Sequence, residues 1–368
     1  MKVAVDAREL SYQPAGKGNY LLSILTAMMV EKDEALQLTL YFQEGGNPED
    51  IKMLICQRSK CNPNSITTCV VRGKGIMWHR TVAKLALQQD VFFAALSYFS
   101  AFFNTIPTVT VVHDLAVFRV QGIMHNAKAS FVERLLLKKM VKKSVAIIAV
   151  SEATAVDLRT YAPMAAAKTT VIPLAPALFD AKQALLPLNK RNGEVLFVGT
   201  LEPRKNITVL LKAYALLDEK VRIKHPLVLI GKKGWGDEDY QQQATQEGIA
   251  GQVQFLGYQE EKVILTHYHE AQVFIYPSVY EGFGLPVVEA MAAGTPVITS
   301  KTPALLEVGG ASAISCTTDK PEEFARALQL LLEDTKEWEQ HSDASLKRSA
   351  DFSWEKSAMA TKQLLQQR

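Results

Sequence analysis

Two glutamates flank a short glycine-containing stretch in the second half of the chain. Glu281 directly precedes Gly282–Gly284, and seven residues separate it from Glu289. The apolar run at residues 271–276 predicts a strand, and the apolar spacing at 285–293 predicts a helix. The first turn of such a helix has unpaired backbone N–H groups and a partial positive charge, which favour an anion. An anion site between two carboxylates suggests a ligand that is part phosphate and part polyol.

A pair of adjacent cations forms a second candidate anion site. Arg204 and Lys205 follow the predicted strand 194–198 and precede a helix that begins near Ile207. Arginine can bind two phosphate oxygens at once and lysine acts as a point charge, so the pair suits a diphosphate. A solvated turn with Asn206 as the helix cap is the alternative. We favour the diphosphate, because both candidate sites follow strands of one predicted sheet.

Two further stretches of the second half carry weaker signals. The glycine-rich residues 231–236 follow the predicted strand 227–230 and are expected to border a nucleotide base. Residues 237–239, Asp-Glu-Asp, match the acidic pattern with which some sugar transferases hold manganese. Acidic residues also favour the first turn of a helix, and we prefer this interpretation. We therefore expect no metal site.

The first half of the chain contributes two glycines and a histidine. Gly16 and Gly18 lie between the first predicted strand and a helix that Asn19 is expected to cap. They do not form the dinucleotide-binding fingerprint, whose third glycine is missing, but they suit a close approach of the backbone to a ligand. His113 follows the apolar run 109–112, at the carboxyl end of a predicted strand. A catalytic and a structural role are equally open for it.

Strand-like and helical segments alternate along the chain, as in parallel sheets with helical crossovers. Most strand-like runs are apolar at consecutive positions, as in strands that are covered on both faces. The expected strands are residues 3–5, 36–42, 66–71, 91–94, 109–112 and 145–150, then 194–198, 227–230, 253–255, 273–276 and 296–299. We infer an α/β fold of two doubly wound, Rossmann-like domains, with the substrate bound in the cleft between them.

The composition is that of an ordinary globular enzyme. With 368 residues the chain is long enough for two domains, and 48% hydrophobic and 21% charged residues are typical of soluble proteins. A net charge of +3 is too small to indicate nucleic acid as a partner. The four cysteines have no zinc or redox spacing, and no signal peptide or membrane-spanning run is expected. These features predict a cytoplasmic protein, with membrane contact at most peripheral.

Basic residues gather in two places in the first half. Four lysines, at 138, 139, 142 and 143, lie on a predicted helix at residues 128–143. A second group surrounds Trp78 and consists of Arg72, Lys74, His79 and Arg80. Solvated helix faces are the default interpretation. Contact with an anionic membrane surface, where a lipid-linked acceptor would be found, is the alternative.

Several of these motifs together resemble a known family. YEGFGLPVVEAMAAGTPVI, which contains both glutamates, and FVGTLEPRKNITVLLKAY (197–214) are similar to the donor-site motifs of the retaining glycosyltransferases of family 4. DARELSYQPAGKGNY (6–20) resembles their N-terminal glycine loop, and VVHDLAVFR (111–119) their acceptor-side histidine. The similarity covers nearly the whole chain and is strongest from 195 to 310. It implies the GT-B fold.

The resemblance also implies roles for individual residues. Arg204 and Lys205 would bind the donor diphosphate, Glu281 would contact the transferred sugar, and His113 would lie near the reacting centre. Glu289 would hold the ribose. The other residues expected to bind the donor are Thr200, Gly282, Phe283, Gly284, Leu285, Gly16 and Gly18. We expect an acceptor-side domain at 1–180, a donor-binding domain at 181–350 and a terminal helix at 351–368 that packs on the first domain.

The implied reaction moves a hexosyl group from a nucleotide diphosphate sugar to a hydroxyl of a glycan or lipid-linked saccharide, with retention and without a metal or other cofactor. Mannose from a guanosine donor is expected from the EPRKN sequence of the loop; a uridine donor is the other candidate. Two alternatives stay open. One is a nucleotide-sugar epimerase of the same fold, and the other is a non-catalytic nucleotide-sugar-binding protein.

Overall fold

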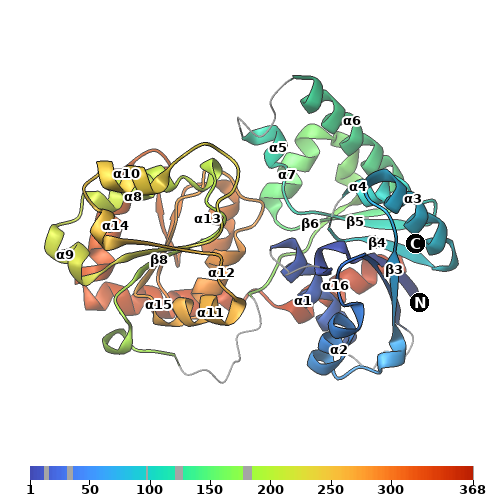
Figure 1. The fold of residues 1–368 in the computed structure, drawn as a ribbon, viewed down its shortest axis with the longest axis horizontal. Coiled ribbons are helices and arrows are strands. Elements are labelled where there is room, and N and C mark those ends of the chain that lie inside the picture. Colours follow the sequence, from blue (N-terminus) through green and yellow to red (C-terminus); the bar gives the residue numbers. More distant parts are fainter. Residues whose placement is uncertain (12–15, 31–35, 97, 121–126, 177–184, 368) are drawn as a thin grey trace. The chain divides into compact units, whose positions relative to one another are not determined.

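The chain forms two compact units, each with its own parallel sheet (Figure 1). The structure is a computed structural model that describes residues 1–11, 16–30, 36–96, 98–120, 127–176 and 185–367. Unit 1 comprises Met1–Leu174 and Ser353–Arg368, and unit 2 comprises Ala175–Phe352. The expected α/β architecture with two Rossmann-like domains is confirmed.

The described residues of unit 1 form a seven-stranded sheet in the order β3-β2-β1-β4-β5-β6-β7. Its strands are β1 Lys2–Asp6, β2 Gln37–Gln43, β3 Ile66–Val71, β4 Val91–Ala94, β5 Thr108–Val112, β6 Ala146–Ala149 and β7 Thr169–Val171. Its helices are α1 Lys17–Met29, α2 Pro48–Ser59, α3 Gly75–Leu85, α4 Tyr98–Ala101, α5 Ala116–Arg119, α6 Ala127–Lys143, α7 Glu152–Tyr161 and α16 Trp354–Gln366.

The described residues of unit 2 form a six-stranded sheet in the order β10-β9-β8-β11-β12-β13. Its strands are β8 Val195–Val198, β9 Leu227–Ile230, β10 Val253–Gly257, β11 Val273–Tyr276, β12 Val297–Ser300 and β13 Ile314–Cys316. Its helices are α8 Ile207–Ala215, α9 Glu219–Lys224, α10 Tyr240–Gln246, α11 Glu261–Glu270, α12 Leu285–Ala292, α13 Pro303–Gly309, α14 Pro321–Glu333 and α15 Thr335–Ser349.

Two strands were absent from the sequence expectation. β7 and β13 are each three residues long and pair with only one neighbour at the edge of their sheets. Their sequences, TTV and ISC, lack the apolar run by which the central strands were recognised. The edge strands β3 and β10 were predicted, but β7 and β13, with three residues each, are too short to show an apolar run.

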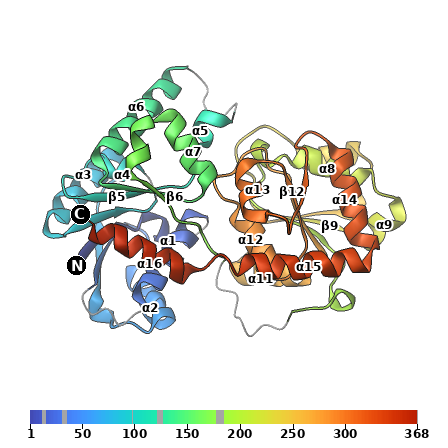
Figure 2. The ribbon, with the colours of Figure 1, turned by 180° about the vertical axis from the view of Figure 1, so that it is seen from behind.

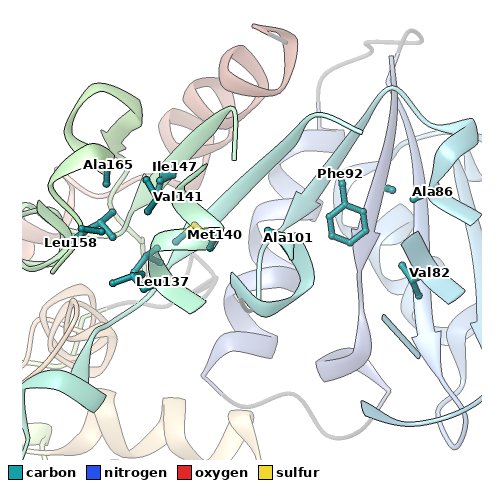
Figure 3. Packing of buried hydrophobic residues seen from close by; sticks show 14 of the residues in the cluster. Val82, Ala86, Phe92, Ala101, Leu137, Met140, Val141, Ile147, Leu158 and Ala165 are labelled. Carbon is teal, nitrogen blue, oxygen red and sulfur yellow. The ribbon is translucent and has the colours of Figure 1, made fainter. Parts of the chain in front are cut away.

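One hydrophobic core of unit 1 packs α3, α6 and α7 against the sheet (Figure 3). α3 contributes Val82, Ala86 follows directly after α3, and α6 contributes Leu137, Met140 and Val141. These side chains are almost fully buried, together with Phe92 of β4 and Ile147 of β6. Burial of each large apolar side chain stabilises the fold by about 1.5–3 kcal/mol relative to its exposure. This packing holds α3 and α6 against the sheet.

The C-terminal helix α16 packs on unit 1. It runs beside α1 in Figure 2, and the rings of Tyr20 and Trp354 lie 5.9 Å apart. The hydroxyl of Ser357 donates a hydrogen bond of 2.7 Å to the carbonyl of Pro173. Within the described part of the chain, no helix is long and apolar enough to cross a membrane.

A buried arginine joins the start of unit 2 to its core. Arg191 stacks on Trp338, with its guanidinium carbon 4.9 Å from the ring centroid. Its guanidinium donates hydrogen bonds to Leu186, Ala271, Ala293, Gly294 and Thr295. Burial lowers the pKa of Arg191 to about 10, so the group stays charged near neutral pH. The guanidinium therefore donates hydrogen bonds to carbonyl and hydroxyl groups around it that would otherwise be buried without a donor.

Replacement of this arginine should destabilise unit 2. In Arg191→Ala, buried carbonyl groups lose their donor, and we expect the free energy of unfolding to fall by about 3 kcal/mol or more. Urea denaturation followed by tryptophan fluorescence measures the change. Arg326→Ala, which removes an exposed arginine of α14, serves as the control and should change stability by less than about 0.5 kcal/mol. Equal effects of the two substitutions would contradict the role of Arg191.

Candidate active site

The candidate site lies where the strand order of unit 2 reverses. β8 and β11 are parallel neighbours, and Val273 pairs with Val195. From β8 the chain continues outward through β9 and β10, whereas from β11 it continues through β12 and β13 on the other side. The segments after β8 and β11 therefore diverge and leave a crevice at the carboxyl ends of the strands. Arg204 and Lys205 follow β8, and Glu281 follows β11.

Glycines allow the segment after β8 to pack closely on the segment after β9. Leu201 forms an isolated parallel bridge with Lys233. A Cβ atom on Gly231 would lie 1.9 Å from the carbonyl oxygen of Gly199, and one on Gly234 would lie 2.7 Å from Cγ2 of Thr200. Gly231 and Gly234 thus leave room for the segment after β8. The sequence pattern did not indicate this role. The expected contact of this segment with a nucleotide base stays a prediction.

Arg204 is held between two carboxylates. Its Nε lies 2.6 Å from Oε1 of Glu202, and its Nη1 donates to Oε2 of Glu281 at 3.0 Å. Nη1 also donates to the carbonyl of Tyr280 at 3.2 Å. The side chain keeps partial access to solvent. The guanidinium is therefore fixed in direction but can still be reached by a ligand.

Lys205 is buried, with only 5% of its surface exposed. Its Nζ donates to Oε1 of Glu281 and to the phenol oxygen of Tyr276, each at 2.5 Å. Burial lowers the pKa of the ammonium group, and the charge of Glu281 opposes this effect while that of Arg204 adds to it. An ammonium group has three donors, and these two bonds orient the third. The structure thus brings Arg204 and Lys205 together with Glu281, which lies more than 70 residues further along the sequence.

Glu281 is ionised at every physiological pH. Burial alone would raise the pKa of its carboxyl group, but the charges of Lys205 and Arg204 outweigh burial and lower the pKa to about 2. The charge of Glu281 and burial in turn raise the pKa of Tyr276 well above its usual value, so this phenol stays neutral. Glu281 can accept hydrogen bonds from sugar hydroxyls and stabilise positive charge. It cannot donate a proton near neutral pH.

The N-terminus of α12 lies beside this carboxylate. Gly284 caps the helix with φ 108°, a left-handed value that favours glycine, and a Cβ atom there would lie 2.7 Å from Leu305. The N–H groups of Val287 and Val288 bond to the carbonyl of Gly284. Within the described residues, the N–H groups of Phe283, Gly284 and Leu285 donate no hydrogen bond. The expected role of these N–H groups in binding an anion stays a prediction.

Glu289 has a partner on a different helix. Its Oε2 accepts a hydrogen bond of 3.0 Å from the phenol of Tyr268, which belongs to α11. Burial and the charge of Glu289 raise the pKa of Tyr268 well above its usual value. The carboxylate is only partly buried, so its second oxygen can accept further bonds. Its expected role with a ribose stays a prediction.

The structure corrects the start of the first helix. α1 begins at Lys17 and is capped by Gly16, not by Asn19, which lies inside the first turn. Gly16 has φ 45°, which glycine adopts without strain, and Gly18 is buried. The preceding residues 12–15 of the expected glycine loop lie outside the described part of the chain.

His113 lies close to the N-terminal half of α1. Its ring meets that of Tyr20 edge-on, with centroids 4.8 Å apart. Its Nε2 lies 2.7 Å from the carbonyl oxygen of Ala95, which can only accept, so Nε2 carries the proton. Burial and the charge of Lys17 lower the pKa of His113 to about 4. The imidazole is therefore neutral near pH 7, with the tautomer set by Ala95.

The acidic stretch at 237–239 provides a helix cap. Asp239 accepts a hydrogen bond of 3.0 Å from the N–H of Gln242 and caps α10, in agreement with the preferred interpretation. Among the residues that the structure describes, no group of three or more His, Cys, Asp or Glu side chains could hold a metal ion.

Two residues of the site were not recognised from the sequence. Glu202 was not distinguished from a surface acid of the loop, and Tyr276 was counted as part of a core strand. The only available signals were the acid two residues before Arg204 and the phenol at the end of β11. Neither signal is specific without the contacts.

Comparisons with known proteins identify the family. Residues 179–348 match the family model described as "Glycosyl transferases group 1", and residues 74–175 match "Glycosyltransferase Family 4". The O-antigen chain mannosyltransferase B of Escherichia coli is 33% identical over 262 residues, which cover 67% of each chain. The serotype-specific mannosyltransferase WbdA of Escherichia coli is 31% identical over 166 residues, 45% of this chain and 20% of that protein.

Solved structures agree on the fold. The Anabaena protein Alr3699/HepE, crystallised with UDP-glucose, superposes with a TM-score of 0.74 over 100% of both chains at 18% identity. The fold and the relatives define a glycosyltransferase with the GT-B fold. The chain belongs to the family 4 glycosyltransferases. Neither the epimerase nor the non-catalytic alternative is favoured by these similarities.

The buried ion pair predicts a specific acid sensitivity. Glu281 has a pKa of about 2 in the fold against 4.5 for a free glutamate, so the unfolded chain binds the proton more readily. This difference in pKa stabilises the fold. The stabilisation is fully present above pH 4.5 and is lost as the pH falls towards 2. As the pH falls from 4.5 towards 2, the free energy of unfolding should fall by roughly 2–3 kcal/mol more in the wild type than in Glu281→Gln.

Urea denaturation at a series of pH values measures this difference. Glu322→Gln, which neutralises an exposed carboxylate of α14, is the matched control and should follow the wild-type profile. Parallel profiles for the wild type and Glu281→Gln would show that the ion pair does not lower the pKa of Glu281.

Proposed function

We propose that this glycosyltransferase moves a mannosyl group from a nucleotide diphosphate donor to a saccharide hydroxyl, with retention of configuration and without a metal. The observation that carries the proposal is the cluster of Arg204, Lys205 and Glu281 at the reversal point of the sheet. At the start of α12, a few residues after Glu281, the N–H groups of Phe283, Gly284 and Leu285 donate no hydrogen bond within the described part of the chain. Cations and aligned amides together suit a diphosphate, and a carboxylate suits the attached sugar.

The site can stabilise the departing diphosphate. As the bond between the anomeric carbon and the phosphate oxygen breaks, negative charge grows on the diphosphate and positive charge grows on the sugar. Arg204, the third donor of Lys205 and the amides of α12 would lie against the negative charge. Donors aimed at a developing charge contribute about 3 kcal/mol each in comparable enzymes. No metal is needed for this step.

Retention is best explained by attack from the face that the diphosphate leaves. The acceptor oxygen would form the new bond to the anomeric carbon, and a phosphate oxygen of the leaving group would take its proton. A double displacement requires a free carboxylate nucleophile. Glu281 is a poor candidate, because both of its oxygens accept hydrogen bonds from cations and its pKa is about 2. Its charge is better suited to stabilising the sugar cation.

Relatives guide the choice of donor and acceptor. Both Escherichia coli relatives are described as mannosyltransferases, and one acts on O-antigen chains according to its name. We therefore propose a mannosyl donor, with guanosine as the expected base, and a saccharide or lipid-linked saccharide as the acceptor.

A transfer assay with GDP-mannose, UDP-glucose and related donors tests the function. Lys205→Ala and Glu281→Ala should each lower transfer by a factor of about 100 or more, because a charge-stabilising contact is lost. Lys212→Ala and Glu333→Ala, at exposed positions of α8 and α14, are the matched controls and should retain activity. Full activity of both site variants would overturn the proposal. Activity should persist in EDTA, and product NMR should show the donor's anomeric configuration.

The phenol of Tyr276 should affect transfer through Lys205. Tyr276→Phe removes the hydrogen bond of 2.5 Å and lets the ammonium group reorient, so kcat/KM should fall by about tenfold, the equivalent of one charge-assisted bond. Tyr214→Phe also removes a buried phenol with hydrogen bonds in unit 2, but away from the cations, and should lower stability without changing kcat/KM. Equal kcat/KM values for both variants would contradict this role.

A further inference from the structure

Two cysteines of unit 1 that are five positions apart in the sequence lie in contact in the fold. Cys56 belongs to the last turn of α2, and Cys61 follows the end of that helix. Their Sγ atoms are 3.5 Å apart. Both are free thiols, as are Cys69 and Cys316. The spacing of Cys56 and Cys61 matches no redox motif, so their contact is a result of the local backbone.

A left-handed residue brings the two thiols together. Lys60 has φ 58° and ψ 25°, and its N–H donates a hydrogen bond of 2.8 Å to the carbonyl of Cys56. This conformation ends the helix and turns the chain back over its last turn. The N–H of Cys61 then donates a hydrogen bond of 3.3 Å to the hydroxyl of Ser59. A straight continuation of α2 would instead carry residue 61 to a different face of the helix from residue 56.

The two thiols differ in their access to solvent. Cys56 is buried, with 6% of its surface exposed, whereas Cys61 is partly exposed. Burial and the contact with Cys61 raise the pKa of the Cys56 thiol to about 11, so this group keeps its proton near pH 7. The thiolate is the reactive form of cysteine, and the reagent must also be able to reach it. Cys61 is therefore the thiol that a dissolved oxidant meets first.

The other two cysteines lie away from this pair. Thr68 of β3 donates a hydrogen bond to Glu49 of α2, so its side chain points towards α2. Cys69 is the next residue, and successive side chains of a strand point to opposite faces of the sheet. It packs against the hydrophobic cluster that contains Trp78. Cys316 is buried in unit 2, so neither cysteine is placed to compete for Cys61.

The pair can close into a disulfide with a small movement. The sulfur atoms of a disulfide are about 2.05 Å apart, so the present distance must shrink by about 1.5 Å. The residues that follow Cys61, which are Asn62, Pro63 and Asn64, are exposed. The segment that carries Cys61 can therefore shift without disturbing the core, while Cys56 stays in place on α2.

We propose that Cys56 and Cys61 form an oxidation site for small hydroperoxides such as hydrogen peroxide. The sulfur of Cys61 attacks one peroxide oxygen, the O–O bond breaks, and a sulfenic acid and one molecule of water are formed. The sulfur of Cys56 then attacks the sulfenic sulfur and the S–O bond breaks, so that the hydroxyl group leaves as water with the proton of Cys56. The two thiols together lose two electrons and two protons, which reduce the peroxide to two molecules of water.

The disulfide would hold the last turn of α2 to the segment that leads to β3. α2 packs on α1 and on β3 within unit 1 (Figure 1). The bond would therefore fasten one layer of unit 1, whereas Arg204, Lys205 and Glu281 belong to unit 2. It would also remove the sulfenic acid before more peroxide converts it irreversibly to sulfinic acid. Transient disulfides of this kind are compatible with a reducing compartment.

Peptide mapping after peroxide treatment of the full chain tests the proposal. The reduced protein is treated with hydrogen peroxide, and the remaining thiols are alkylated in denaturant with N-ethylmaleimide. We expect two of the four cysteines to lose their label and to regain it after dithiothreitol. Trypsin should then release the peptides 53–58 and 61–72 joined by a disulfide. Since peptide 61–72 also contains Cys69, the mapping is repeated with Cys69→Ser, which should keep the joined peptides.

Substitutions of the pair distinguish the two thiols. Cys61→Ser, at the partly exposed position, should abolish the joined peptides while the fold survives. Cys56→Ser should instead leave Cys61 as a sulfenic acid, which dimedone labels and which excess peroxide converts to sulfinic acid. Cys316→Ser is the matched control and should form the disulfide like the wild type. Oxidation should raise the thermal unfolding midpoint of the wild type, because the bond restricts the unfolded chain, but not that of Cys61→Ser.

Three outcomes would overturn the proposal. One is the absence of the joined peptides from oxidised Cys69→Ser, and another is the same amount of disulfide in Cys61→Ser as in the wild type. The third is a disulfide found only in covalent dimers, because the bond would then join two chains. None of these measurements depends on sugar transfer, so the proposed function is tested separately.

Discussion

The structure of the site depends on the buried ion pair between Lys205 and Glu281. A lone charge in this position would be strongly destabilising. The pair is acceptable because Lys205 also donates a hydrogen bond to Tyr276, and Glu281 also accepts one from Arg204. With Glu202 the cluster contains two cations and two carboxylates, so its charges balance before any ligand arrives.

The position of the pair follows from topology. β8 begins at Val195 and β11 at Val273, yet the two strands are adjacent, because the chain completes β9 and β10 before it returns. The two segments that leave these strands diverge, and among the described residues the N–H groups of Phe283, Gly284 and Leu285 at the start of α12 donate no hydrogen bond. Glycines make the approach of the loops possible: Gly231 and Gly234 admit the backbone and side chains of the segment after β8. The strand order and these glycines together bring Arg204 and Lys205 close to Glu281.

The sequence predicted the central strands well, because buried strands follow a local pattern. Buried parallel strands are apolar at consecutive positions, and Arg204-Lys205 and Glu281 each follow such a strand. The sequence was less accurate for short strands and for the residue that caps a helix. The edge strands β7 and β13 lack an apolar run, and α1 is capped by Gly16 because its backbone, rather than the side chain of Asn19, adopts the required geometry.

By itself the sequence determined the class of fold, the family and the residues from which a donor site could be built. These depend on motifs that each combine a strand, a turn and a helix within about 20 residues, so a local pattern is enough to recognise them. Only the tertiary structure decided which groups share a hydrogen-bond network. Glu202 and Tyr276 became part of the site through contacts with Arg204 and Lys205, and His113 became a neutral imidazole through burial and the carbonyl of Ala95. Ionisation and hydrogen bonding depend on groups that are distant in sequence and adjacent in space, and no local pattern contains that information.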